Sequence, residues 1–508
     1  MSKAMPIKIL SRRIRGSAVI KRVAAALGVA LVLGGCSLAP AYHTPTLPPM
    51  PASFKEGDTA WKVAAPSDQV SRGNWWTVYN DSALSRLETK LDADNPSLAA
   101  ALARYDASRA FESQLRSGLF PVFGAMANPL RARQSNNRPL RGSNQPNEYD
   151  ADTIGLEADY DLDLWGRIRN EVSQGHALAQ ASQADLASAK LSLESQLAND
   201  YMRLRGYDIQ VSTLQDALKA YQRALELTEN RHGGGIASGL DVSRAQAQLD
   251  DAQAQVTDVL AQRAITEHAI ATLVGVPASS FSIASEQDSL QVPVTPVGVP
   301  STLLERRPDI AAAERRVFSA NAGIGVARAA FFPDLSLSGA IGFQDTGMGS
   351  LLATGNRFWA LGPLATLNLF DGGLRRAKLR EAHAEFAVAS DVYRQTVLDA
   401  FRQVEDDLAL LHQLGIEAHQ EDQAYAAAQQ TLNIATNRYR EGIVNYLDVV
   451  TAQTAALSAQ RNAEAIRTRR LQASVDLIRA LGGGWSRDTG MDVAAATKTD
   501  APEQASAR

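Results

Sequence analysis

IGLEADYDLDLW, residues 154–165, alternates apolar or aromatic residues with small or acidic ones from end to end. One set comprises Ile154, Leu156, Ala158, Tyr160, Leu162 and Leu164, and the other comprises Gly155, Glu157, Asp159, Asp161 and Asp163. A period of two is typical of a β-strand with two unlike faces. Most of the remaining chain reads as long helix rich in Ala and Gln, so this strand belongs to a largely helical protein.

The sequence repeats itself at a distance of about two hundred residues. Residues 95–121 align without gaps on residues 307–333, and both segments end in Phe-Pro. Further along, RHGGGIASGLDVSRAQ at 231–246 aligns on RYREGIVNYLDVVTAQ at 438–453. Two matches in the same order at nearly the same shift predict a duplicated structural unit of roughly two hundred residues.

Each copy, 76–290 and 291–485, predicts a helix, two alternating strands, a helix of about 65 residues, a Gly-containing turn and a helix of about 33 residues. The strands are expected near 120–133, 149–165, 333–344 and 358–370, and the turns at 231–241 and 438–448. A helix of about 65 residues spans roughly 100 Å, more than a globular domain needs. Small apolar residues at steps of three and four in the following helices predict a coiled-coil-like seam, which a conventional long-helix bundle would share.

The N-terminus predicts export. Residues 1–35 hold seven Lys or Arg and no acidic residue, and the apolar run VAAALGVALVL at 23–33 suits the core of a signal peptide. Without this segment the net charge of −4 becomes −11, because seven positive charges are removed. An acidic mature chain is a poor nucleic-acid binder, so we expect no nucleic acid among its partners.

Cys36 is the single cysteine, so the chain can form no internal disulfide. It follows Leu-Gly-Gly, an arrangement that resembles the lipobox of bacterial lipoproteins, in which the Cys becomes the lipidated first residue. Ser37 rather than Asp after it implies delivery to the outer membrane. Ordinary cleavage that leaves an incidental thiol is the alternative. We expect residues 36–75 to form a lipidated, Pro-rich tether and residues 486–508 a disordered tail.

The chain shows no pattern typical of an enzyme. Its seven His residues are scattered without a His-x-x-x-His pair, and the Gly triplets at 233–235 and 482–484 lack the Gly-Lys-Ser/Thr ending that holds phosphate. We therefore expect no catalytic residue, no metal and no cofactor other than the covalent lipid on Cys36.

The predicted strands have about the length that a tilted strand needs to cross a bilayer, and their alternation suits an apolar-out, polar-in barrel. A strand of a soluble sandwich would show the same period. Four strands are too few to close a pore, and open sheet edges are not tolerated in lipid. The chain should therefore share its strands with other copies, three of which give twelve strands. The acids Glu157, Asp159, Asp161 and Asp163 would then face a water-filled lumen.

Several motifs together resemble the outer-membrane efflux factor family (TolC-like), in its lipoprotein branch that serves RND-type multidrug pumps. They are LGGC before Ser37, NWWTVYNDSALSRL at 74–87, LERRPDIAAAERRVFSANAGIGVARAAFFPDLSLSG at 304–339, FDGG at 370–373 and RYREGIVNYLDVVTAQ. The resemblance covers about residues 40–485. It implies a mixed α+β membrane protein: a homotrimer with a twelve-stranded transmembrane barrel, continued by a long α-helical barrel in the periplasm.

The resemblance also implies partners and a mechanism. The protein would be a passive exit duct for drugs or other small compounds, held in outer-membrane lipid and joined to a periplasmic adaptor and an inner-membrane RND-type pump. An exit duct for ABC-driven type I protein secretion is an alternative within transport. A structural lipoprotein that tethers the outer membrane is an alternative of another class.

The family's helical tips close the duct and receive the adaptor. The resemblance places Asp448 in a ring of carboxylates at the constriction, and makes Tyr439 and Asp241 a latch between two hairpins. Thr451 stands where many relatives have a second Asp, and Val444 where some have a latching Arg. The expected adaptor-docking residues are Gly235, Ser238, Leu240, Gly442, Asn445 and Leu447. A structural alternative is that Asp241 and Asp448 cap the helices that they begin.

Overall fold

The computed structural model describes residues 37–49, 54–56, 72–137, 146–286, 290–293 and 306–483. The chain divides into two compact units. The first comprises Met1–His43, Arg109–Leu178 and Val317–Ala389, and the second comprises Thr44–Ser108, Ala179–Arg316 and Ser390–Arg508. The predictions for the signal peptide, Cys36 and the tail at 486–508 lie outside the described residues.

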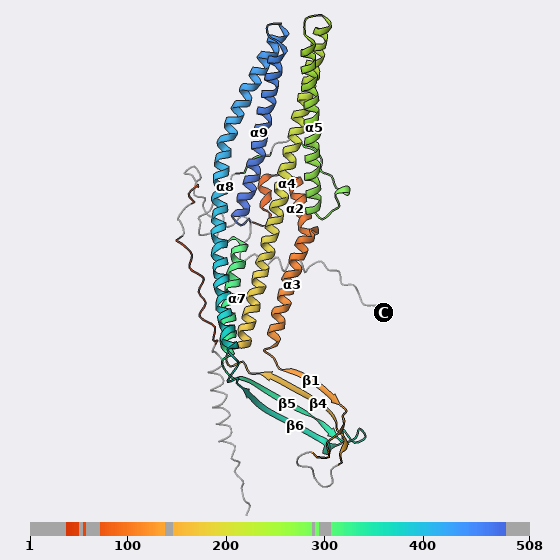
Figure 1. Ribbon diagram of the computed structural model, residues 1–508, viewed down its shortest axis with the longest axis vertical. Helices are drawn as coiled ribbons and strands as arrows, with labels where there is room; N and C mark the ends of the chain where they lie inside the picture. Colours follow the sequence, from red (N-terminus) through yellow and green to blue (C-terminus); the bar gives the residue numbers. More distant parts are fainter. Residues whose placement is uncertain are drawn as a thin grey trace, which may run out of the picture. The chain divides into compact units, whose positions relative to one another are not determined.

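The first unit contains a four-stranded antiparallel sheet in the order β1-β4-β5-β6 (Figure 1). Its strands are β1 (Val122–Asn128), β4 (Asp152–Asp161), β5 (Asp334–Asp345) and β6 (Arg357–Thr366). A separate pair, β2 (Arg131–Arg133) and β3 (Glu148–Asp150), extends the β1–β4 hairpin. In the described chain β1 and β6 are the outer strands, so each leaves one edge without a partner.

Two of the predicted strands were too long. The strand expected at 120–133 is divided into β1 and β2 around Pro129, which has no N–H to donate to a ladder. The strand expected at 149–165 is divided at Ala151 and ends at Asp161, although the alternation in the sequence continues to Leu164. There the Trp165 indole donates to the Pro333 carbonyl at 2.9 Å, and Gly166 turns the chain with φ +75°.

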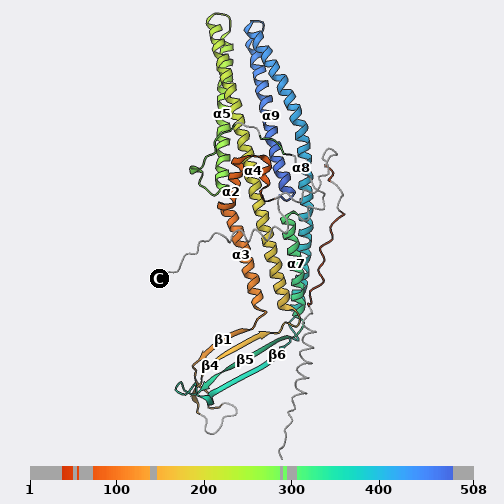
Figure 2. The ribbon, with the colours of Figure 1, turned by 180° about the vertical axis from the view of Figure 1, so that it is seen from behind.

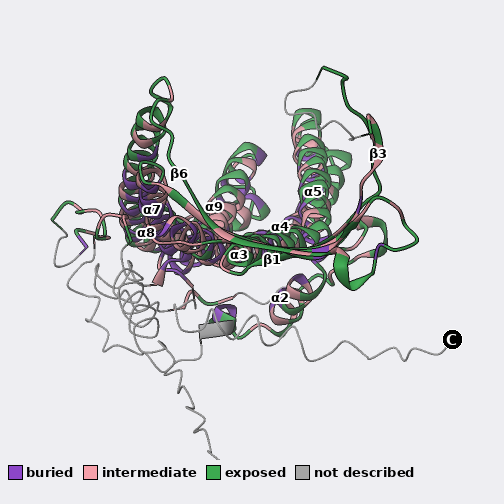
Figure 3. Ribbon diagram, turned by 90° about the horizontal axis from the view of Figure 1, so that it is seen from below, coloured by how far each residue is buried: buried purple, intermediate pink, exposed green. Residues whose placement is uncertain are grey.

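The strand register collects the apolar residues on one face of the sheet. Leu156 pairs with Ile341, and Ile341 pairs with Trp359 on the next strand; all three are exposed. Residues that are directly opposite share a face, so this apolar row crosses three strands. The other face carries Glu157 and Asp159, whose carboxylate accepts a hydrogen bond from the Ser338 hydroxyl at 2.6 Å. In Figure 3, β1 and β6 are drawn largely in the exposed and intermediate colours.

The helices recur in pairs of equal length. The pairs are α3 (Pro96–Ser117) and α7 (Pro308–Ala329), α4 (Arg167–Gly233) and α8 (Leu374–Arg440), and α5 (Gly239–Leu273) and α9 (Tyr446–Ala480). Both α4 and α8 have 67 residues, or roughly 100 Å at 1.5 Å per residue. In Figures 1 and 2, α5 lies along α4 and α9 lies along α8, as two helical hairpins. No helix among the described residues is both long and apolar enough to cross a membrane.

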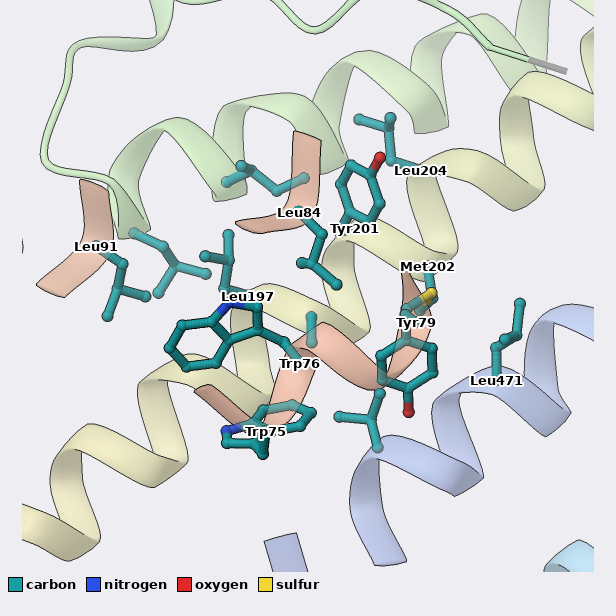
Figure 4. Packing of buried hydrophobic residues seen from close by; sticks show 14 of the residues in the cluster. Trp75, Trp76, Tyr79, Leu84, Leu91, Leu197, Tyr201, Met202, Leu204 and Leu471 are labelled. Carbon is teal, nitrogen blue, oxygen red and sulfur yellow. The ribbon is translucent and has the colours of Figure 1, made fainter. Parts of the chain in front are cut away.

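The core of the second unit is built on the NWWTVYN motif. This motif forms the 3₁₀ segment η1 (Arg72–Tyr79), which is followed by α2 (Ser82–Asp94). Trp75, Trp76 and Tyr79 are buried against side chains of α2, α4 and α9 (Figure 4). The Trp75 indole donates to Glu194 at 3.0 Å, and the Tyr79 and Ser474 hydroxyls lie 2.7 Å apart. Two short 3₁₀ turns, η2 (Ala278–Ser280) and η3 (Thr354–Asn356), complete the elements.

The segment expected to form a Pro-rich tether contacts helices where it is described. In the first unit, the Ser37 hydroxyl donates to the Asn170 side chain at 2.8 Å, and the Asn321 amide donates to the Pro40 carbonyl at 2.9 Å. In the second, Phe54 packs in an apolar cluster with residues of α8 and α9. The Pro-rich sequence keeps the segment extended, and the helices supply its hydrogen-bond partners.

Candidate functional site

The two hairpin turns have the same backbone structure. At the end of α4, Gly235 has φ +74° and donates to the His232 carbonyl, while the Ile236 N–H donates to the Arg231 carbonyl. At the end of α8, Gly442 has φ +78° and donates to the Tyr439 carbonyl, while the Ile443 N–H donates to the Arg438 carbonyl. This pair of bonds is the Schellman motif, and the positive φ explains the Gly in each turn.

Each turn exposes two aliphatic side chains at matching positions. Ile236 and Leu240 of the first turn are 71% and 58% exposed, and Ile443 and Leu447 of the second are 59% and 44% exposed. The six expected docking residues all lie on these two turns. Ile236 and Ile443 lie within the two expected docking segments, 235–240 and 442–447, but were not named singly, although each directly follows the Gly of its turn.

The aspartates expected at the gate differ in their surroundings. The Asp241 carboxylate accepts hydrogen bonds from the N–H and hydroxyl of Ser238, which caps α5, and lies 3.8 Å from Arg244. This is a capping box. At the second turn Asn445 caps α9 by accepting the Asp448 N–H, and the exposed Asp448 carboxylate has no hydrogen bond or ion pair in the described chain. Thr451, also exposed, donates to the Leu447 carbonyl of its own helix.

Tyr439 is only 5% exposed and lies between the two hairpins. Its ring packs against Tyr446 at 5.3 Å and belongs to an apolar cluster with Ala245 and Val449. Its hydroxyl lies 3.4 Å from the Thr228 hydroxyl. The described chain shows no hydrogen bond between Tyr439 and Asp241, and Asp241 takes the capping role that was the alternative to a latch.

Arg231, which the sequence did not single out, joins the two hairpins. Its Nη1 donates to the Tyr439 carbonyl at 2.6 Å, and its guanidinium carbon lies 4.5 Å from the centre of the Tyr439 ring. Its counterpart in the second copy, Arg438, is exposed.

Tyr446, which packs against Tyr439, is protonated at neutral pH. Burial, with the nearby Tyr439, Tyr221 and Asp241, raises the pKa of Tyr446 to about 12.

The acids of the first alternating strand do not form one row. Glu157, Asp159 and Asp161 lie on the same face of β4, opposite the apolar row. Asp163 was wrongly placed with them. It follows the end of β4 and accepts hydrogen bonds from the Ile168 and Arg169 N–H groups, at the start of α4. A carboxylate at a helix N-terminus satisfies free N–H groups. The Asp163 side chain therefore binds the start of α4 and does not continue the acidic face of the sheet.

No group of His, Cys, Asp and Glu within the described ranges could hold a metal ion. The second unit presents two exposed turns and several contacts between the hairpins, of which those of Tyr439 lie nearest the turns. The first unit presents a sheet with an acidic face.

Comparison with known proteins gives consistent matches. The profile of the family described as "Outer membrane efflux protein" matches residues 89–276 and 299–483. The chain is 32% identical over 464 residues to the toluene efflux pump outer membrane protein TtgC of Pseudomonas putida, covering 91% of this chain and 95% of that one. It is 31% identical over 473 residues to the pyoverdine export outer membrane protein OpmQ of Pseudomonas aeruginosa, covering 91% and 97%.

Solved structures show the same fold. The structure of the outer-membrane channel OprN matches with a TM-score of 0.82 and 31% identity, over 89% of this chain and all of that one. The open state of the MtrE outer membrane channel of Neisseria gonorrhoeae matches with a TM-score of 0.78 and 29% identity, over 89% and 100%.

Proposed function

The chain belongs to the outer membrane efflux protein family and is an outer-membrane efflux channel; we propose that three copies of it close one duct and pass small compounds from a periplasmic adaptor and an RND-type inner-membrane pump. The predictions of the family, of its mixed α+β fold and of an outer-membrane location with a periplasmic helical part are confirmed. Its relatives are channel components rather than enzymes.

The observation that carries the proposal is the four-stranded sheet, which has an exposed apolar face and two edges without a partner in the part of the chain that the structure describes. Because the order β1-β4-β5-β6 is antiparallel throughout, β6 of one copy can pair antiparallel with β1 of the next. Three copies then close twelve strands and leave no edge in lipid. The apolar row of Leu156, Ile341 and Trp359 faces the lipid, and Glu157, Asp159 and Asp161 face the lumen.

The substrate class follows from the relatives. Those described above are an efflux protein for toluene and an export protein for pyoverdine, both small compounds, which favours efflux over protein secretion. A strain that lacks the protein should become more sensitive to small toxic compounds while its secreted proteins are unchanged. Loss of a secreted protein instead would support the secretion alternative.

We also propose that a lipid on Cys36 anchors the mature chain, and mass spectrometry of the purified protein tests this.

The lumen acids should set ion preference. Replacing Glu157, Asp159 and Asp161 by Gln, Asn and Asn removes three negative charges per copy from the polar face of β4. We expect a lower ratio of cation to anion permeability, measured as the reversal potential in a salt gradient across a planar bilayer. The trimer should still form, because the three acids are exposed and the amide oxygens of the variant can still accept from Ser338 and Arg167. Loss of the trimer would show that the two faces were assigned in reverse.

The two turns are proposed to form the periplasmic gate and to receive the adaptor. Exposed aliphatic side chains at matching positions on both turns give the adaptor two similar apolar contacts. Asp448, whose carboxylate has no partner in the described chain, can stand with its two copies around the constriction. Opening then requires only that the adaptor bind the open state more tightly than the closed one.

Replacing Asp448 by Asn tests this ring. Three carboxylates at a constriction attract cations, so we expect the Asn variant to lose cation preference at an unchanged number of channels, as measured by the reversal potential. Asp258→Asn is the matched control, since Asp258 is also exposed on a hairpin helix but lies about five helical turns from the tip. Equal effects of the two substitutions would argue against a ring at Asp448.

A further inference from the structure

The contact between the hairpins connects specific backbone positions of the two turns. The Arg231 carbonyl accepts the hydrogen bonds from Ile236 and Ala237 that close the first turn. The Tyr439 carbonyl accepts the bond from Gly442 that closes the second turn. The Arg231 guanidinium then donates to this same Tyr439 carbonyl at 2.6 Å. One side chain thus joins the carbonyl groups on which both turns depend.

The surroundings of this contact favour a firm interaction. Tyr439 is 5% exposed, and its ring, 4.5 Å from the guanidinium carbon, presents its electron-rich face to the cation. A hydrogen bond from a charged donor is stronger than one between neutral groups, and partial burial strengthens it further. The planar guanidinium can donate to a carbonyl while it stacks on a ring, which an ammonium group cannot do equally well.

We propose that Arg231 is the residue that latches the two hairpins of the periplasmic gate, through the carbonyl and the ring of Tyr439. The proposal rests on the proposed function, since it assigns a residue to the gate described there. It replaces the expected latch between the Tyr439 hydroxyl and Asp241. In this arrangement the Tyr439 hydroxyl is dispensable, whereas the guanidinium and the aromatic ring are required.

The arrangement links adaptor binding at either turn to the same contact. An adaptor that displaces Ile236 or Ile443 moves a turn whose hydrogen bonds end on the Arg231 or the Tyr439 carbonyl. Movement of either carbonyl lengthens the hydrogen bond from the Arg231 guanidinium to the Tyr439 carbonyl. Adaptor binding at one hairpin therefore weakens the contact of that hairpin with the other. The adaptor therefore needs no separate site for opening the gate.

Four variants of the full-length trimer test the latch by single-channel recording in planar bilayers. Arg231→Gln should raise the fraction of time spent in high-conductance states by about tenfold, the size expected for losing one charge-assisted hydrogen bond. Arg231→Lys should give a smaller rise. Tyr439→Phe should behave like the unchanged protein, because the ring and carbonyl remain. Arg438→Gln is the matched control, since Arg438 holds the same position in the second turn but is exposed.

Two results would overturn the proposal. One is an increase with Tyr439→Phe as large as that with Arg231→Gln, which would return the latch to the hydroxyl. The other is no change with Arg231→Gln while the variant still forms SDS-resistant trimers. In the second case, if Asp448→Asn still lost cation preference, the proposed gate at the tips would stand and only the proposed Arg231 latch would be rejected. If Asp448→Asn and Arg231→Gln both left a conducting trimer unchanged, the proposed gate itself would fall.

Discussion

Replacing Gly342 by Ala is expected to prevent formation of the stable channel. Gly342 of β5 lies opposite Gly155 of β4, and the two backbones approach closely there. A Cβ on Gly342 would overlap the Ile154 carbonyl oxygen and lie 2.7 Å from the Gly155 Cα. Backbone atoms of a paired strand cannot rotate away, so β4 would have to separate from β5. Such overpacking costs about 1–3 kcal/mol or more per copy.

The effect should be multiplied in the assembly, because a strand that cannot pair in one copy breaks the closed barrel of all three. We expect the SDS-resistant trimer band to disappear from outer-membrane fractions. Gly362→Ala is the matched control, since Gly362 lies on the same face of the sheet, in β6, with no atom within 4 Å of an added Cβ. A normal trimer yield for Gly342→Ala would show that β4 and β5 are further apart than described.

The stability of the protein should fall as the pH rises above about 5, and Glu88 should be the main cause. Glu88 of α2 is fully buried, and neither of its carboxyl oxygens has a hydrogen-bond partner in the described chain. Burial, with the neighbouring Glu194 and Asp92 outweighing Lys190, raises the pKa of Glu88 from 4.5 to about 10. Burial also raises the pKa of Glu194 to about 7, against the opposing effect of Lys190.

The sign follows from proton binding. Between pH 4.5 and 10 the folded chain holds a proton on Glu88 that the unfolded chain has released, so raising the pH favours unfolding. One such proton contributes about 1.4 kcal/mol per pH unit, or up to about 4 kcal/mol between pH 5 and pH 8. Thermal unfolding of the purified trimer, followed by circular dichroism across this range, measures the fall.

Glu88→Gln keeps the shape of the side chain but cannot ionise. We expect this variant to be more stable than the unchanged protein at pH 8 and to depend less on pH. The remaining slope below about pH 7 is owed to Glu194 and to Asp407, because burial raises the pKa of each to about 7. Glu226→Gln, at an exposed position of α4, is the control and should leave the slope unchanged. An equally steep slope in Glu88→Gln would place the responsible proton elsewhere.

Local sequence patterns were enough for most of the architecture. The alternation at 154–161, the predicted helices of about 65 residues and the Gly turns at 235 and 442 all correspond to observed elements. These features depend on neighbours within a few residues, which a single stretch of sequence contains. The efflux family and the outer-membrane location followed from specific motifs, because motifs such as RYREGIVNYLDVVTAQ combine a turn with the apolar seam of the next helix.

The sequence did not decide the contacts of an acidic side chain that could bind either a nearby helix end or a distant group. Asp163 continues the alternation of the strand but caps α4, because the first N–H groups of a helix need acceptors. For Asp241 the sequence left two roles open, a latch with Tyr439 and a cap of its own helix, and the structure shows the cap, with Ser238. In both cases the helix end, a few residues away, offers the carboxylate more hydrogen bonds than the distant partner.

The sequence by itself determined the repeating elements, the two faces of the strands and the class of protein. Only the tertiary structure decided that Arg231 contacts Tyr439, that Glu88 is buried beside Glu194 and Lys190, and that Gly342 opposes Gly155. Each of these contacts joins segments roughly one to two hundred positions apart. Periodicity records which side of an element is apolar, whereas the identity of the side chain opposite depends on how distant segments pack, and no local pattern contains that information.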